Sequence, residues 1–86
     1  MRAVRIHQFG GPEVLQVDEI PTPTPGPGQV LVRLRAIGVN FIDTYHRTGL
    51  YRISLPFIPG QEGAGEVVAV GPGVTEFREG DRVAYA

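Results

Sequence analysis

The stretch at residues 59–74 limits the fold more than any other part of the chain. Its first half is rich in glycine, at Gly60, Gly63 and Gly65. An apolar, β-branched run at residues 67–70 follows, and Gly71-Pro72-Gly73 then interrupts it. Glycine permits close backbone approach, and β-branched residues favour strands. The pattern therefore predicts a close-packed backbone turn, a largely buried strand and a second, tight turn.

These glycines invite comparison with a dinucleotide-binding loop, but the order is wrong. They are arranged as G-x-x-G-x-G, whereas the fingerprint is G-x-G-x-x-G between a strand and a helix. Here a β-branched run follows, so no helix N-terminus is available for a pyrophosphate. We interpret the glycines as places where two backbones approach closely. Two polar residues, Gln61 and Glu62, stand at the entrance to the strand, where function is often located.

Composition indicates one small domain that is mainly β. The chain has 86 residues, with 12 Gly and 8 Pro, which favours short strands and turns over helices. A formal net charge of −1 argues against nucleic acid or an anionic membrane as the main partner. No apolar run is long enough to span a membrane. There is no cysteine, which excludes disulfides and cysteine-ligated zinc and makes the cytoplasm the simplest compartment.

Alternating and β-branched segments predict strands at residues 1–7, 15–19, 29–36, 66–70 and 82–86. In the third of these, Val30, Val32, Leu34 and Ala36 are expected on one face, and Gly38 is expected to break the pattern. The proline-rich residues 21–28 predict an extended surface loop. Residues 50–59 predict an irregular apolar loop, and residues 74–79 a surface connection.

One short helix is predicted at residues 40–47. Asn40 is a good N-cap, and Asp43 suits the first turn of a helix. Phe41 and Tyr45 have helical spacing, and Thr48-Gly49 is a typical stop. Asn40 and Asp43 are therefore expected to lie near each other at the start of the helix.

Several motifs together resemble the N-terminal part of the medium-chain dehydrogenase/reductases, in particular the zeta-crystallin-like quinone oxidoreductase branch. Their order and spacing carry the resemblance over the whole chain. They are Gly10-Gly11-Pro12-Glu13-Val14-Leu15, Pro25-Gly26-Pro27-Gly28-Gln29-Val30-Leu31-Val32, Gly38-Val39-Asn40-Phe41-Ile42-Asp43-Thr44-Tyr45, Pro59-Gly60-Gln61-Glu62-Gly63-Ala64-Gly65-Glu66-Val67 and Gly80-Asp81-Arg82-Val83.

The resemblance implies a GroES-like, partly open β-barrel with one short helix. Residues 1–86 would be the N-terminal part of its substrate-side domain, and the family's Rossmann domain would lie further along a longer chain. It also implies a homodimer formed through that nucleotide domain. The 86-residue piece alone is expected to be inactive.

The resemblance also allows a prediction about metal binding. Zinc-containing relatives have a cysteine at the position of Asn40 and a histidine at the position of Gln61, beside the glutamate matching Glu62. Asn and Gln amides are poor zinc ligands, so we expect no metal site. His7 and His46 have no ligand partners at metal spacing, and we interpret both as ordinary surface or packing residues.

Without a metal, the resemblance implies hydride transfer from NADPH to a quinone or enone. Candidate catalytic residues are Asn40, Asp43, Tyr45 and Tyr51, with Asn40, Phe41 and Gln61 as candidate cofactor contacts. Asn40 can position a nicotinamide or donate to a substrate oxygen, while the tyrosines can pack on a planar ring. Asp43 either orients its neighbours or only favours the helix N-terminus. For Tyr45, Gln61 and Glu62, a packing or supporting role remains the simpler interpretation.

Two other functions stay open on the sequence. The first is an enoyl or alkenal reductase of the same superfamily, because the shape of the pocket would decide the acceptor. The second is a stand-alone GroES-like module without enzymatic activity. The reading frame after Ala86 distinguishes the second from an enzyme, because a Gly-rich βαβ unit there would indicate a nucleotide-binding domain.

Overall fold

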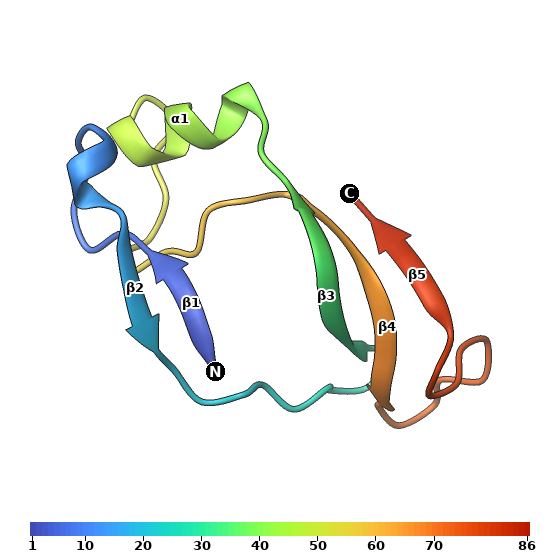
Figure 1. Cartoon of the computed structure of the whole chain (residues 1–86). Helices are drawn as coiled ribbons and strands as arrows, with labels where there is room; N and C mark the ends of the chain where they lie inside the picture. The colour runs from blue at the N-terminus through green and yellow to red at the C-terminus, as the bar shows by residue number, and fades with distance from the viewer. The chain divides into compact units, whose positions relative to one another are not determined.

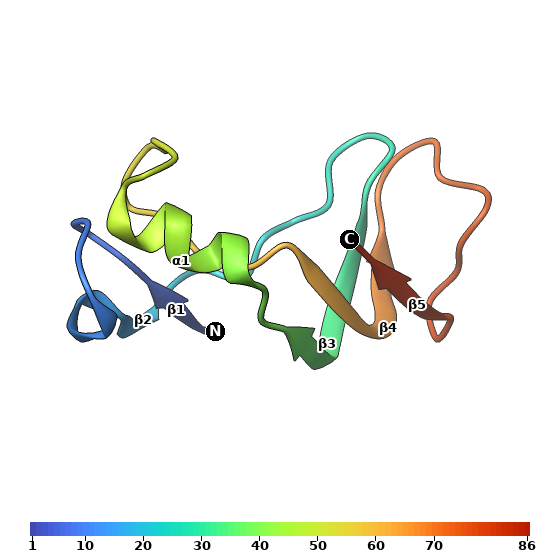
Figure 2. The same cartoon turned by 90° about the horizontal axis from the view of Figure 1, so that it is seen from above.

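The computed structural model describes residues 1–86 and divides into two compact units. Unit 1 comprises Met1–Pro21 and Val39–Gln61, and unit 2 comprises Thr22–Gly38 and Glu62–Ala86. Figure 1 labels the α-helix and the strands, and Figure 2 shows them from above. Sheet pairing stays within each unit: β1 pairs with β2 in unit 1, and β3, β4 and β5 form one sheet in unit 2. The prediction of a mainly β chain with one α-helix is confirmed, although the strands do not close into a barrel.

In unit 1, β1 (Arg2–Arg5) and β2 (Gln16–Glu19) form an antiparallel ribbon, with the short 3₁₀ helix η1 (Pro12–Val14) between them. Directly after β1, Ile6 forms an isolated bridge with Phe57, through backbone hydrogen bonds of 2.9 and 3.1 Å. Ile6 is fully buried and Val14 nearly so. The core of unit 1 therefore lies where the end of β1 meets the loop before β4.

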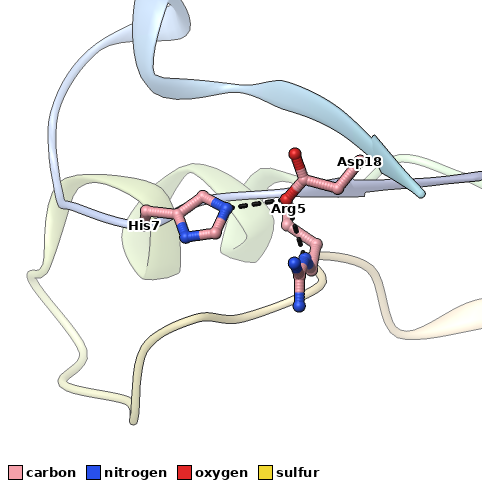
Figure 3. A network of polar contacts seen from close by, with 3 residues as sticks. All are labelled: Arg5, His7 and Asp18. Carbon is pink, nitrogen blue, oxygen red and sulfur yellow. Dashed lines mark hydrogen bonds and ion pairs between the residues drawn. The ribbon is translucent and has the colours of Figure 1, made fainter. Parts of the chain in front are cut away.

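One face of the ribbon carries a polar network, drawn in Figure 3. Oδ2 of Asp18 accepts a hydrogen bond from Nε of Arg5 at 2.8 Å and lies 2.6 Å from Nε2 of His7. Asp18 pairs with Ala3 across the ribbon, so alternation places Arg5 on the same face. The hydrogen bonds from His7 and then Arg5 lower the pKa of Asp18 below its ordinary value. His7, which the sequence left as an ordinary residue, therefore links the end of β1 to β2.

In unit 2, β3 (Val30–Gly38), β4 (Glu62–Val70) and β5 (Arg82–Tyr85) form an antiparallel sheet in that order. The expected strand at residues 29–36 is present as Val30–Gly38, so it ends two residues later than predicted, with Gly38 as its last residue. The strict two-face alternation was wrong, because Arg35 has no partner where the register shifts between Leu34 and Ala36. The other shift, between Leu31 and Val32, adds a residue to β4. Such bulges bend a strand and turn its side chains.

The predicted turn over the glycines was a further error, because β4 already begins at Glu62. Gly63 and Gly65 lie inside the strand and are both buried. A Cβ on Gly65 would collide with the backbone carbonyl of Arg33, and one on Gly63 would come within 2.7 Å of the Leu34 side chain. The interpretation that the glycines allow two backbones to approach closely was therefore correct. Gly63 and Gly65, which suggested a turn, instead allow β4 to pair tightly with β3.

The tight turn after β4 is confirmed and is tied to the proline-rich loop. Gly71 is buried, and its N–H donates to the Gln29 carbonyl at 2.8 Å. The N–H of Gly28 donates to the Pro72 carbonyl at 3.1 Å. Residues 21–28 contain no helix or strand, as predicted, and β3 begins at Val30, one residue later than expected. Two turns thus bond to each other where β3 begins and β4 ends.

Candidate functional site

The predicted site residues come mainly from helix α1 (Phe41–Thr48) in unit 1. Asn40 is the N-cap, and Gly49 ends the helix in the left-handed conformation, with φ of 85°. The predicted start and stop are therefore confirmed. In the capping box between Asn40 and Asp43, the backbone N–H of Asn40 donates to Oδ2 of Asp43 at 2.9 Å. A box of this kind satisfies backbone donors at the helix start and fixes the direction in which the chain enters it.

Asp43 is buried, with 8% of its surface exposed. Its Oδ2 accepts the hydrogen bond from the Asn40 N–H, which confirms the prediction that Asp43 favours the helix N-terminus. Its other oxygen, Oδ1, is buried and has no hydrogen-bond partner. Buried carboxylate oxygens normally have partners, so the cap does not account for this side chain fully.

Three aromatic side chains make consecutive edge-to-face contacts, and we call Phe41, Tyr45 and Tyr51 the aromatic row. The ring centroids of Phe41 and Tyr45 are 5.4 Å apart at 76°, and those of Tyr45 and Tyr51 are 5.3 Å apart at 73°. The N–H of Tyr51 donates to the Tyr45 carbonyl at 3.3 Å. Phe41 is 74% and Tyr51 51% exposed, while Tyr45 is half-buried between them. The row thus offers two accessible ring surfaces.

Along the sequence, the division between the two units falls between Gln61 and Glu62. Gln61 is an exposed residue of unit 1, and no hydrogen bond joins it to Asn40 or Asp43. Glu62 belongs to unit 2, where it pairs with Gly38 and its side chain covers the space that a Cβ on Gly38 would fill. The supporting role expected for these two residues stays a prediction. The role that the structure shows for Glu62 is in the pairing of β3 with β4, opposite Gly38.

The side chains of this chain do not fit a zinc site. Nowhere do three or more His, Cys, Asp or Glu side chains gather closely enough to hold a metal ion. The candidates Asn40 and Gln61 present amides, which bind zinc poorly. Two shallow hollows occur in unit 2, one beside Val30 and Phe77 and one beside Arg35 and Val83. Neither is lined by a predicted site residue. No helix is long and apolar enough to cross a membrane.

Sequence reasoning gave His46 and Phe57 no part in the site. The ring of His46 lies 6.3 Å from that of Tyr51 and 5.5 Å from that of Phe57, both edge-to-face. The spacing of His46 to Tyr51 spans the end of the helix, so no helical periodicity could reveal the contact. Only the fold of the loop at residues 50–59 brings Phe57 back to the helix.

Comparison with known proteins identifies the class of domain. Residues 26–86 match the family described as the alcohol dehydrogenase GroES-like domain. The chain is 56% identical to a quinone oxidoreductase of Pseudomonas aeruginosa, over 99% of this chain and 26% of that protein. Its structure matches that of Escherichia coli quinone oxidoreductase complexed with NADPH at a TM-score of 0.97 and 48% identity, covering 100% of this chain and 27% of that one.

A cobalt- and zinc-bound thermostable alcohol dehydrogenase from Pyrobaculum aerophilum is also similar, at a TM-score of 0.91 and 45% identity over 98% of this chain and 26% of that one. The chain belongs to the GroES-like domain family of the alcohol dehydrogenases, and the resemblance to quinone oxidoreductases of the medium-chain dehydrogenase/reductases is confirmed. It spans about a quarter of the length of these relatives. Because relatives with different ligands share this backbone, the fold alone does not select metal or metal-free chemistry.

Proposed function

We propose that the full-length protein is an NADPH-dependent, zinc-independent quinone reductase and that this chain supplies the acceptor side of its site. The observation that carries the proposal is the aromatic row, which begins on α1 next to an N-cap amide in a chain without any thiolate. A quinone is planar and already electrophilic. It therefore needs ring contacts and hydrogen-bond polarisation more than a Lewis acid.

Each residue of the row then has a distinct task. Exposed ring surface on Phe41 and Tyr51 packs against planar rings, and the half-buried Tyr45 keeps the two apart. The amide of Asn40 and the tyrosine hydroxyls can donate hydrogen bonds to an acceptor oxygen as negative charge develops there. The Asp43 carboxylate holds the backbone of Asn40 in place through the capping box.

Asn40 and Phe41 at the start of α1, together with Gln61 directly before β4, also suit a nicotinamide. Asn40 and Gln61 are exposed amides, which match the donors and acceptors of a carboxamide, and the 74% exposed ring of Phe41 stands directly after Asn40. NADPH would supply the hydride when bound. Support for this cofactor comes from the NADPH complex of the Escherichia coli relative. The choice of NADPH over NADH depends on residues outside this chain.

The test is NADPH oxidation by the full-length protein with 1,4-naphthoquinone, with and without a metal chelator. We expect turnover that the chelator leaves unchanged. The variant Asn40→Asp keeps a favourable N-cap but removes the amide donor. It should lower kcat/KM about 100-fold, the effect of removing one donor to a developing oxyanion. Val39→Ala, at a residue 87% exposed, is the matched control and should change little.

The outcomes separate the alternatives. Absence of NADPH consumption with any small quinone would contradict the proposal. Faster turnover of 2-alkenals than of quinones would favour the enoyl or alkenal reductase. Loss of activity on chelation would show that the metal-free assignment is wrong.

The family likeness also suggests how the protein assembles, and the absence of cysteine suggests where it is located. We propose a homodimer and a cytoplasmic protein, with a small quinone or enone rather than nucleic acid as the partner. The net charge of −1 agrees with the absence of a nucleic-acid partner. Light scattering of the full-length protein measures the oligomeric state directly.

A further inference from the structure

His46 stands beside Tyr45 on α1, and its ring contacts two rings from the loop that follows the helix. The centroid distances are 6.3 Å to Tyr51 and 5.5 Å to Phe57, with interplanar angles of 61° and 63°. Aromatic rings favour this edge-to-face arrangement. We propose that His46 is a positioning residue, which holds Tyr51 against Tyr45 and so sets the width available to a planar acceptor. The part concerning the acceptor depends on the proposed function.

The contact with Phe57 connects His46 to a buried backbone bridge of unit 1. Phe57 exchanges two backbone hydrogen bonds with Ile6, at 2.9 and 3.1 Å. Ile6 is fully buried and directly follows β1. The ring contacts therefore run from this buried bridge through His46 to Tyr51. A fixed point at one end is what a positioning contact requires.

Tyr51 has little else to hold it. It lies beyond the end of α1, and its side chain is 51% exposed. Its backbone donates one hydrogen bond, to the Tyr45 carbonyl at 3.3 Å, which fixes the main chain but not the ring. The ring itself is held by Tyr45 and by His46. If the His46 contact is removed, one of these two ring contacts is lost and Tyr51 must be ordered when the acceptor binds.

The environment of Nδ1 indicates that His46 acts through the ring contacts rather than through a hydrogen bond at this nitrogen. Nδ1 is buried and has no hydrogen-bond partner. A phenylalanine at this position would keep an aromatic edge for both Tyr51 and Phe57 and would remove the unpaired nitrogen. A leucine would keep apolar volume but would lose the aromatic contact. The two substitutions therefore separate ring positioning from simple filling of space.

The experiment compares wild type, His46→Phe and His46→Leu in the full-length protein, with His46→Gln as a second variant without an aromatic ring. With 1,4-naphthoquinone, we expect KM to rise about three- to tenfold in the Leu and Gln variants, the range that one aromatic pair accounts for. We expect kcat to stay within about twofold, because His46 touches no reacting group in this proposal. His46→Phe should keep KM within about twofold of wild type.

A second readout does not depend on activity. Nuclear Overhauser contacts between the Tyr45 and Tyr51 rings should persist in wild type and His46→Phe and should weaken in His46→Leu and His46→Gln. Unchanged contacts in a folded Leu or Gln variant would overturn the proposal, as would equal loss in the Phe variant. If wild type reduces no quinone, the proposed function fails, and these ring contacts still decide whether His46 positions Tyr51.

Discussion

Unit 2 is held together mainly by main-chain pairing between its three strands, whereas unit 1 is held together much more by contacts between individual side chains. In unit 2, β4 pairs along its length with β3 and partly with β5, and its glycines let the strands approach closely. Unit 1 has a short ribbon, one backbone bridge at Ile6, a polar network at Asp18 and a set of aromatic contacts. The predicted site residues other than Glu62 belong to unit 1.

This difference suggests a division between scaffold and site. Backbone pairing tolerates exchange of exposed side chains but not added atoms between strands. Side-chain contacts fix particular groups in particular orientations, which a binding site requires. Native-state hydrogen exchange in the full-length protein reports the opening of each unit separately, so it can test the comparison.

The largest effect is expected from Gly65→Val in unit 2. Any Cβ there collides with the Arg33 carbonyl, which is main chain and cannot move aside cheaply. We expect about 3 kcal/mol or more of destabilisation, with faster exchange along β3 and β4. Gly73→Ala is the control: it has open space but φ of 81°, so it should cost only about 1 kcal/mol. Equal costs at the two positions would contradict the close-packing explanation.

A somewhat smaller effect is expected from Ile6→Ala in unit 1. Ile6 is fully buried, and truncation leaves a cavity beside the bridge to Phe57. The expected cost is about 3 kcal/mol, measured as faster amide exchange in unit 1 while β3–β4 amides stay protected. Val17→Ala, at a side chain 67% exposed on the ribbon, should cost less than about 0.5 kcal/mol. Equal loss of protection in both units would show that they open together.

Asp43→Ala tests the capping box and is expected to cost about 1 kcal/mol. The Asn40 N–H loses its acceptor, so the first turn of α1 should exchange faster while the end of the helix changes less. Asp43→Asn retains an acceptor oxygen and should cost less than the alanine. If both variants cost the same, the carboxylate charge rather than the hydrogen bond stabilises the helix start.

The smallest effect concerns the Asp18 network and pH. The pKa of Asp18 is lowered by hydrogen bonds from His7 and then Arg5, so its contribution to stability is fully present above the ordinary aspartate value of 3.8. This contribution should be lost as the pH falls from that value through the lower pKa of the folded state. Melting temperature measured across this acid range, for wild type and Asp18→Asn, checks it. The two curves should converge at the acid end; curves that stay parallel would contradict the assignment.

Much of the secondary structure was predictable because it follows from local chemistry. The N-cap at Asn40 and the stop at Gly49 depend on side-chain and backbone preferences within one turn. The proline-rich loop and the turn after β4 are equally local. The prediction of a turn at Gly63 and Gly65 was wrong because glycine serves both turns and close strand pairing, and the partner strand is distant in sequence.

The site was predictable as residue types but not as an arrangement. The sequence by itself determined that the chain has no thiolate, that an amide begins the helix, and that aromatic residues follow it, because these depend only on residue identity and helical period. Only the tertiary structure decided that His46 and Phe57 connect Tyr51 to the buried Ile6, and that β3 bulges. Contacts of this kind depend on how a loop returns to a helix and how two distant strands align, which no local preference specifies.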